Sequence, residues 1–103
     1  MGKVYLVGIP EDDLYKIGWT RGKIEDRIAP LQTGNAKKIE VIHLFETDHH
    51  VKVEGWMHRM HGSKRMEGEW FELTQEDVNA FLNNCKKGHD MFQMLKESGN
   101  PFI

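Results

Sequence analysis

Four side chains with complementary chemistry occur in order along the first half of the chain: Tyr5, Lys16, Arg27 and Glu54. A phenolate can accept a proton, and a neighbouring ammonium favours this ionised form of a phenol. A guanidinium binds phosphate, and one carboxylate with several waters suits Mg²⁺ or Mn²⁺, which prefer oxygen ligands. Singly, each residue has an ordinary structural explanation. Together they are what in-line attack on a phosphodiester requires, because the arginine and the ion stabilise the added charge.

The first two of these residues belong to a strand, a turn and a second strand. The segments are Val4–Ile9, the cluster Pro10-Glu11-Asp12-Asp13, and Leu14–Thr20. Apolar and β-branched residues on both sides of a Pro/Asp cluster are typical of two strands with a tight connection. We expect Tyr5 and Lys16 to stand directly opposite each other across this turn, with side chains about 5 Å apart.

A helix should carry the arginine. We expect it from Lys23 to about Ala29 or Leu31, because Ile24, Ile28 and Leu31 recur at helical spacing. Arg27 lies at the border of that apolar face and should project over the edge of the sheet. Pro30 should kink or end the helix, since its ring clashes with the carbonyl four residues earlier.

A third strand is predicted at Ile39–Phe45, followed by a helix that carries Glu54. On the strand, Ile39, Val41, His43 and Phe45 should share one face, while Ile42 and Leu44 share the other. Apolar residues on both faces indicate a sheet covered on both sides. The helix should be capped by Thr47 or Asp48 and should run to about His61.

The remaining residues predict one short strand and two helices. Glu69–Leu73 reads as a short strand or extended segment. Thr74-Gln75-Glu76-Asp77 is an N-terminal cap pattern for a helix through Asn84, and a final helix should lie near Asp90–Lys96. We expect these helices, within residues 75–103, to pack on the same domain or on a partner.

The sequence also contains candidate residues for a zinc site and for a nucleophilic cysteine. The residues His50, Glu54, His58 and His61 have spacings that place ligands on one helix face, as a zinc site would need. The metalloprotease pattern His-Glu-x-x-His, with the glutamate directly after the first histidine, does not occur, so a solvated polar face is the simpler explanation. The lone Cys85 should lie at a helix C-terminus, where the dipole disfavours a thiolate and hence nucleophilic catalysis.

Length, composition and net charge limit the classes of protein to which this chain can belong. A chain of 103 residues with 39% hydrophobic and 29% charged residues is one ordinary globular domain. The net charge of −2 lacks the basic signature of a nucleic-acid binder, but residues 1–65 carry +2 and residues 66–103 carry −4. No apolar run approaches the length of about 20 residues that a membrane span needs, and no signal-peptide pattern is present. A single cysteine favours a reducing, cytoplasmic location.

Six segments together resemble the motifs of the GIY-YIG nuclease superfamily, and within it a small phage-borne branch described as DNA-binding. Val4-Tyr5-Leu6 looks like the first motif, and Tyr15-Lys16-Ile17-Gly18-Trp19-Thr20 looks like the second, with lysine in place of its tyrosine. Arg27 matches the helix arginine, and Glu54, followed by His58, matches the metal-binding glutamate. Leu31-Gln32-Thr33-Gly34-Asn35 and Gly68-Glu69-Trp70-Phe71 are similar to stretches typical of the branch. The resemblance spans roughly residues 3–74.

The resemblance implies an α+β fold with a three-stranded antiparallel sheet flanked by helices over residues 1–74, and a helical extension over 75–103. It also implies metal-dependent hydrolysis of DNA with Mg²⁺ or Mn²⁺, in a phage-encoded protein of a bacterial host. In that mechanism Tyr5 is the general base, Lys16 tunes it, Arg27 steadies the phosphate and Glu54 binds the metal. His43 or His58 would be an auxiliary proton acceptor. Substrate contacts are expected from the second motif and the loop that follows it, at Tyr15, Thr20, Arg21 and Lys23.

Two alternatives stay open at this stage. The same groove could hold nucleic acid or a phosphorylated small ligand without catalysis, which the sequence pI of 6.3 and the lysine at position 16 both favour. Alternatively, the acidic C-terminal helices could form the interface of a homodimer. Metal affinity distinguishes an enzyme from both alternatives, and a concentration-dependent mass would reveal the dimer.

Overall fold

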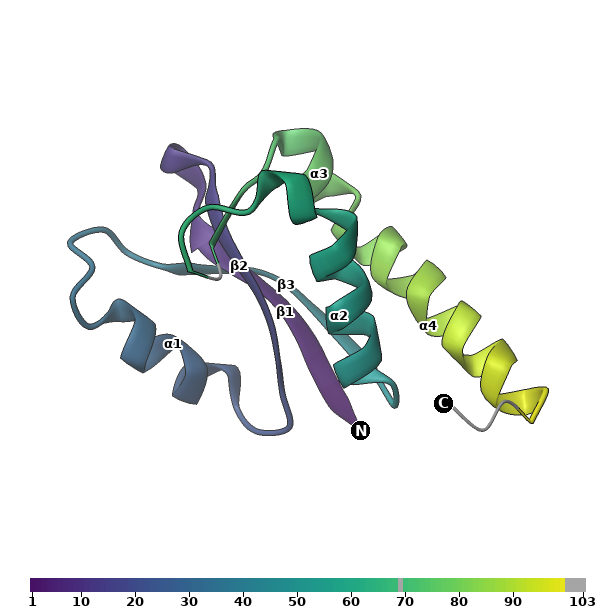
Figure 1. Ribbon diagram of the computed structural model, residues 1–103. Coiled ribbons are helices and arrows are strands. Elements are labelled where there is room, and N and C mark those ends of the chain that lie inside the picture. The colour runs from purple at the N-terminus through teal and green to yellow at the C-terminus, as the bar shows by residue number, and fades with distance from the viewer. Residues whose placement is uncertain (69, 100–103) are drawn as a thin grey trace.

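A four-stranded antiparallel sheet in the order β3-β1-β2-β4 forms the centre of the protein (Figure 1). The computed structural model describes residues 1–68 and 70–99. The strands are β1 (Gly2–Ile9), β2 (Leu14–Thr20), β3 (Glu40–Thr47) and β4 (Trp70–Glu72). The sheet therefore has one strand more than the three that were expected. The segment foreseen as a short strand or extended chain pairs with β2, although Glu69, its first residue, lies outside the described part.

The β1–β2 hairpin sets the register of the candidate site. Its turn is a short 3₁₀ helix, η1 (Pro10–Asp12), closed by Asp13 at a left-handed φ of 55°. The first pair after the turn is Ile9 with Leu14, so Tyr5 pairs with Gly18, and Lys16 pairs with Val7. The predicted direct opposition of Tyr5 and Lys16 is wrong. Lys16 is instead the diagonal neighbour of Tyr5 on the same face of the sheet.

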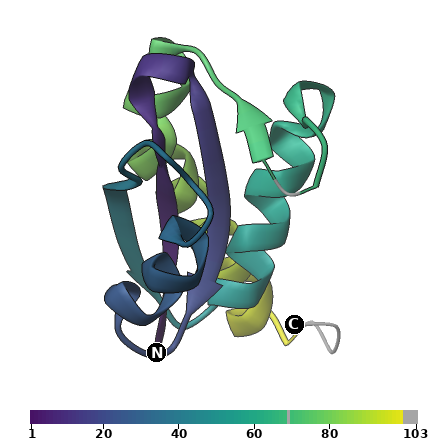
Figure 2. The ribbon, with the colours of Figure 1, turned by 90° about the vertical axis from the view of Figure 1, so that its left-hand side faces the viewer.

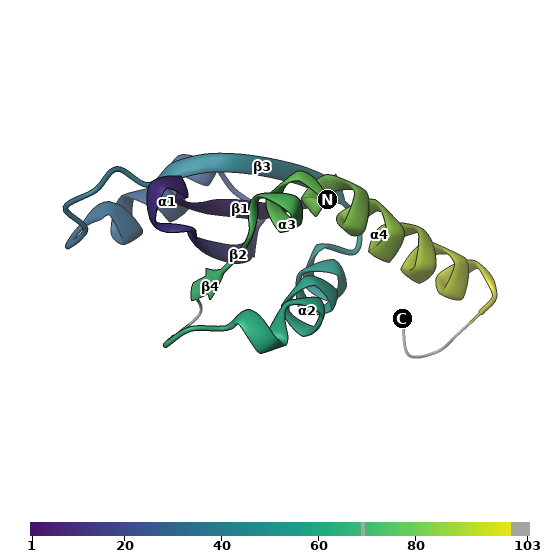
Figure 3. The same cartoon turned by 90° about the horizontal axis from the view of Figure 1, so that it is seen from above.

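Helices cover both faces of the sheet, as the apolar pattern of the third strand predicted. Figure 2 looks onto the face covered by α1 (Ile24–Gln32), with α4 (Phe81–Glu97) behind the strands and α2 (His50–Met60) beside β2. The view from above in Figure 3 shows α2 and α4 close together on their side of the sheet. Between α1 and the sheet lies a small cluster built on Tyr5, Val7, Ile9 and Ile39.

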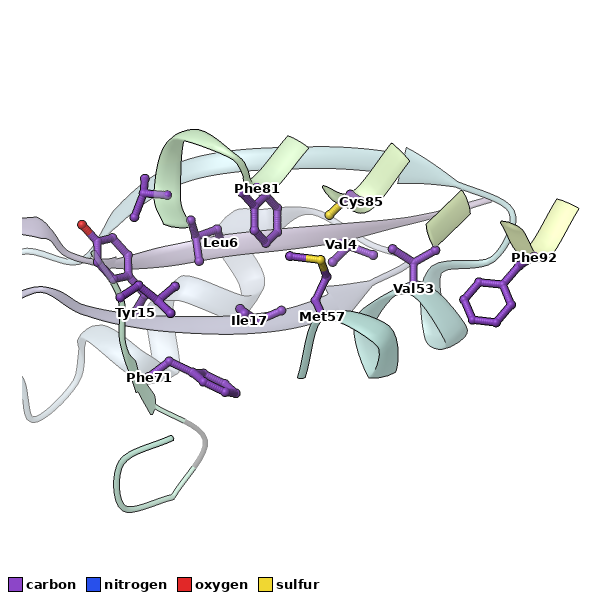
Figure 4. Close-up of a cluster of buried hydrophobic side chains, with 12 residues drawn as sticks. Val4, Leu6, Tyr15, Ile17, Val53, Met57, Phe71, Phe81, Cys85 and Phe92 are labelled. Atoms are coloured by element: carbon purple, nitrogen blue, oxygen red, sulfur yellow. The ribbon is translucent and has the colours of Figure 1, made fainter. Parts of the chain in front are cut away.

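The larger core lies between the sheet and the pair α2 and α4. Figure 4 shows Leu6 and Ile17 of the sheet facing the helical side chains Met57 and Phe81. These four side chains are at most 1% exposed. Burying a large apolar side chain stabilises the fold by about 1.5–3 kcal/mol. The α4 helix therefore belongs to the main core through Phe81, Cys85 and Phe92.

A β-bulge changes the faces of β3. Leu6 pairs with His43, but the next residue of β1, Val7, pairs with Val41, so Ile42 has no partner of its own. The extra residue reverses the alternation on its N-terminal side. Ile39 therefore packs in the cluster under α1, while Phe45 packs on the opposite face. The prediction that Ile39, Val41, His43 and Phe45 share one face is wrong for this reason.

The helices differ from expectation at their ends. Pro30 lies inside α1, which ends two residues later at Gln32. The N-cap of α2 is His49 rather than Thr47 or Asp48, although Thr47 Oγ1 accepts the His49 backbone N–H at 3.0 Å.

The C-terminal helices break at a different place from the predicted one. The capping box of Thr74 and Asp77 opens α3 (Gln75–Asn79), as predicted. The chain then breaks at Ala80 and continues as α4 for 17 residues, without the expected gap between Asn84 and Asp90. Within the described residues, no helix has the length and apolar character to cross a membrane.

Candidate active site

A polar pocket of about 260 Å³ lies where β1, β2, α1 and α2 meet. Its lining contains all four residues singled out for their chemistry, together with two neighbours from β2. The lining residues are Tyr5, Lys16, Gly18, Trp19, Arg27 and Glu54. The chain therefore brings a phenol, an ammonium, a guanidinium and a carboxylate from four different elements to one place.

Tyr5 is held over its cross-strand partner. The ring is only 5% exposed and belongs to the cluster under α1. A Cβ added at Gly18 would stand 2.4 Å from both Cζ and Oη of Tyr5, closer than real contacts allow. The phenol therefore packs directly on Gly18, because only a residue without a side chain lets the hydroxyl lie against the backbone of β2.

The position of Glu54 follows from the short length of β4. That strand pairs only with Leu14–Lys16, so the edge of β2 beyond Lys16 must be satisfied by another element. His58 of α2 does so, since its Nε2 lies 2.7 Å from the Ile17 carbonyl oxygen and donates to it. One turn earlier on the same helix, Glu54 reaches the pocket, with Oε2 3.6 Å from His58 Nε2.

Arg27 reaches the pocket from the other side. Ile24 and Ile28 of α1 pack on the cluster under that helix, which leaves Arg27 exposed to solvent while it lines the pocket. This is the position over the sheet that helical spacing predicted. An exposed guanidinium at a pocket wall can contact a phosphate without first breaking buried contacts.

The donor set suits a hard divalent ion that keeps most of its waters. Glu54 supplies the carboxylate, the Tyr5 oxygen lies in the same pocket, and the volume leaves room for water molecules. Within residues 1–68 and 70–99, no group of three or more His, Cys, Asp or Glu could hold a metal by itself. An ion at Glu54 would therefore be bound in the manner of Mg²⁺ or Mn²⁺ rather than of zinc.

Two predicted site residues lie on the opposite face of the sheet. Tyr15 is 2% exposed in the main core, where burial, reinforced by Asp13 and Glu40, raises its pKa. His43 Nε2 lies 3.1 Å from the Val78 carbonyl oxygen, and its ring stacks on Phe81. The structure does not bring either residue to the pocket of Tyr5 and Glu54.

The other predicted substrate contacts lie in and after the end of β2. Thr20 is buried, and its Oγ1 accepts the backbone N–H of Gly22 at 3.0 Å, which shapes the turn. Arg21 is exposed and donates from Nε to His50 Nε2 at 3.1 Å. Lys23 is exposed at the N-cap of α1. None of these three residues is among the described residues that line the pocket of Tyr5.

Sequence reasoning missed the contribution of Trp19 to the pocket. The indole is half-buried, and its ring lies 5.0 Å from the His50 ring and 5.6 Å from the Arg21 guanidinium carbon. An aromatic residue directly after the glycine of the second motif is the signal that could have identified it. Gly18 is different, because a glycine inside a strand already indicates in sequence that another group comes close to the backbone there.

Cys85 takes no part in the site. It is fully buried in the first half of α4, not at a helix C-terminus as expected. Burial raises the pKa of its thiol to about 12, which removes the thiolate at neutral pH. The conclusion against a nucleophilic cysteine therefore stands on burial rather than on the helix dipole.

Comparison with known proteins gives one family. The family model described as the T5orf172 domain matches residues 2–86, which include every residue of the pocket. No curated protein and no solved structure matches the chain significantly.

Proposed function

The chain belongs to the T5orf172 domain family, and we propose that it is a metal-dependent DNA endonuclease of the GIY-YIG type. The family is associated with phages and is related to nuclease-type modules, which points to a function connected with nucleic acid. The observation that carries the proposal is the convergence of Tyr5, Lys16, Arg27 and Glu54 in one pocket.

The reaction is the attack of water on a phosphodiester. The ionised Tyr5 oxygen accepts a proton from the water, whose oxygen forms a bond to phosphorus as the bond from phosphorus to the 3′ oxygen breaks. Arg27 holds the non-bridging oxygens of that phosphate, where negative charge accumulates. Lys16, diagonal to Tyr5 on the same face of the sheet, adds positive charge in the pocket beside the Tyr5 oxygen.

Glu54 would hold the divalent ion, which supplies charge stabilisation for the leaving 3′ oxygen when it is bound. His58 is a positioning residue. Its Nε2 donates a hydrogen bond to the Ile17 carbonyl, which fixes α2 against β2 and thereby determines the position of Glu54. Gly18 acts in the same indirect way, because it lets the Tyr5 hydroxyl lie in the pocket.

Nicking of supercoiled plasmid tests the proposal. Wild-type protein with Mg²⁺ or Mn²⁺ should convert the plasmid to the open circular form, and chelation of the ion should stop it. Glu54→Gln keeps the shape of the side chain and should lose at least 100-fold of the rate. Glu46→Gln removes an exposed carboxylate of β3, outside the pocket, and should nick like wild type.

The outcome also distinguishes catalysis from binding alone. If no metal ion supports cleavage by wild-type protein at any pH, yet the protein binds DNA in competition with inorganic phosphate, the pocket is a binding site without chemistry. Metal-independent cleavage that Glu54→Gln leaves unchanged would contradict the assignment of Glu54.

A further inference from the structure

A second pocket of about 240 Å³ lies at the start of α2, beside the one that holds Tyr5 and Glu54. Its lining comes from the loop after β2, from the turn between β3 and α2, and from the first turn of α2: Arg21, Asp48, His49, His50, Val51 and Lys52. Arg21 and Lys52 are exposed cations, and Asp48 is an exposed carboxylate, so the pocket carries an excess of one positive charge when the histidines are neutral.

Trp19 of the first pocket contacts two residues of the second. It lines the first pocket, while its ring contacts His50 and lies under the guanidinium of Arg21, and both of these residues line the second. A cation over an indole face is held by about 0.5–1 kcal/mol at an exposed site. The two pockets are therefore adjacent, connected through the contacts of Trp19.

Arg21 is fixed in direction by contacts on two sides. Its Nε donates to His50 Nε2, and the His50 ring is itself 6% exposed and packed against the backbone of Gly2. A Cβ at Gly2 would come within 2.4 Å of that ring. With Nε engaged and the side chain resting on Trp19, the terminal nitrogens of the guanidinium are pre-oriented to bind an anion.

Helix α2 contributes side chains to both pockets. Glu54 lines the first pocket, and His50, one i, i+4 step earlier on the helix, lines the second. Four residues of α-helix rise about 6 Å, so the two pockets lie within reach of neighbouring phosphates of one nucleic-acid strand.

We propose that the second pocket binds the phosphate next to the one that is cleaved, with Arg21 as its principal ligand and Lys52 as added positive charge. The inference rests on the proposed function and narrows its substrate class. The preferred substrate is a strand with consecutive phosphates, because an isolated phosphodiester fills only the first pocket.

Two substrates distinguish the pockets. One is a short single-stranded oligodeoxynucleotide, and the other is bis(p-nitrophenyl) phosphate, a diester with a single phosphate. Arg21→Gln should raise KM for the oligonucleotide about tenfold, since one charged hydrogen bond is lost, and should leave kcat/KM for the small diester unchanged. Lys87→Gln removes one charge from α4, outside both pockets, and should change neither value. Equal losses on both substrates, or no loss on either, would overturn the second phosphate site.

If the protein hydrolyses neither substrate, the proposed nuclease function is refuted, but a binding measurement still tests the second phosphate site. The affinity for a fluorescein-labelled oligodeoxynucleotide is then measured by anisotropy across a range of salt concentrations. Each phosphate contact contributes about 0.7 to the slope of log K against log salt for a single strand. Arg21→Gln should lower the magnitude of the slope by about that amount, and Lys87→Gln should leave it alone. Identical slopes for wild type and Arg21→Gln would refute the inference.

Discussion

The Tyr5 phenol lies directly against the backbone of its cross-strand partner Gly18, at a distance that leaves no room for a Cβ. The glycine is therefore part of the site, although it contributes no functional group. The relationship arises from the hairpin register, in which the turn at Pro10–Asp13 places residue 18 opposite residue 5.

Replacing this glycine should displace the phenol. Gly18→Ala forces either the Tyr5 ring or the strand to move, and overpacking of this kind costs about 1–3 kcal/mol. We expect a lower midpoint in urea and a large loss of cleavage. Gly22→Ala is the matched control, because its Cβ would meet only Thr20 Oγ1, at an ordinary 3.8 Å. If Gly18→Ala has the same cleavage rate and the same urea midpoint as Gly22→Ala, Gly18 does not determine the position of the tyrosine.

Arg27 should affect chemistry without affecting stability. Its side chain is exposed, so Arg27→Ala should change the free energy of unfolding by no more than about 0.5 kcal/mol. The same change should reduce the cleavage rate by about 10²–10³, because it removes a group that stabilises charge on the phosphate. Arg59→Ala, at an exposed position of α2 outside the pocket, should retain the rate. Equal rates for the two variants would remove Arg27 from the mechanism.

Two buried histidines should make stability depend on pH. Burial lowers the pKa of His50, helped by Arg21 and the N-terminal amine, and burial also lowers the pKa of His61, against an opposing effect of Asp77. The unfolded chain therefore takes up protons first as the pH falls below about 6.5, the ordinary histidine value. Stability is fully present above that pH and is lost progressively down to the folded-state pKa values.

Urea unfolding at a series of pH values measures this effect. Wild-type protein should lose stability below about pH 6.5, with a slope of at most about 1.4 kcal/mol per pH unit for each histidine. His61→Leu removes one titrating group while filling its buried position, so its profile should be flatter over the same window. Parallel profiles for the two proteins would show that His61 does not drive the acid sensitivity.

Residue type and spacing were enough to predict much of this architecture. The α+β class, the hairpin, the helix that carries Arg27 and the cover on both faces of the sheet follow from apolar periodicity, which reflects local burial. The placement of Arg27 at the edge of the apolar stripe of α1 follows from helical geometry alone. These features depend on neighbours within about two turns or one strand, so the sequence records them directly.

The features that were missed depend on contacts between distant segments. The Tyr5–Gly18 register depends on where the turn begins, and a shift of two residues separates Tyr5 from Lys16. The bulge at Ile42 reverses the faces of β3, and no local pattern marks it. His58 and Glu54 reach their positions because β4 stops short along β2, which only the assembled sheet determines. The second pocket is likewise invisible in sequence, since Trp19 and His50 are far apart in the chain.

Comparison of the two tyrosines tests the central claim most directly. Tyr5→Phe removes one oxygen from the pocket, and Tyr15→Phe removes one oxygen from the opposite face of the same hairpin. Single-turnover nicking of plasmid is measured for both at saturating Mn²⁺, with the fold of each checked by circular dichroism. The account predicts that Tyr5→Phe loses at least 100-fold of the rate while Tyr15→Phe keeps it. Cleavage by Tyr5→Phe at the wild-type rate would contradict the account, because the phenol would then have no part in the reaction.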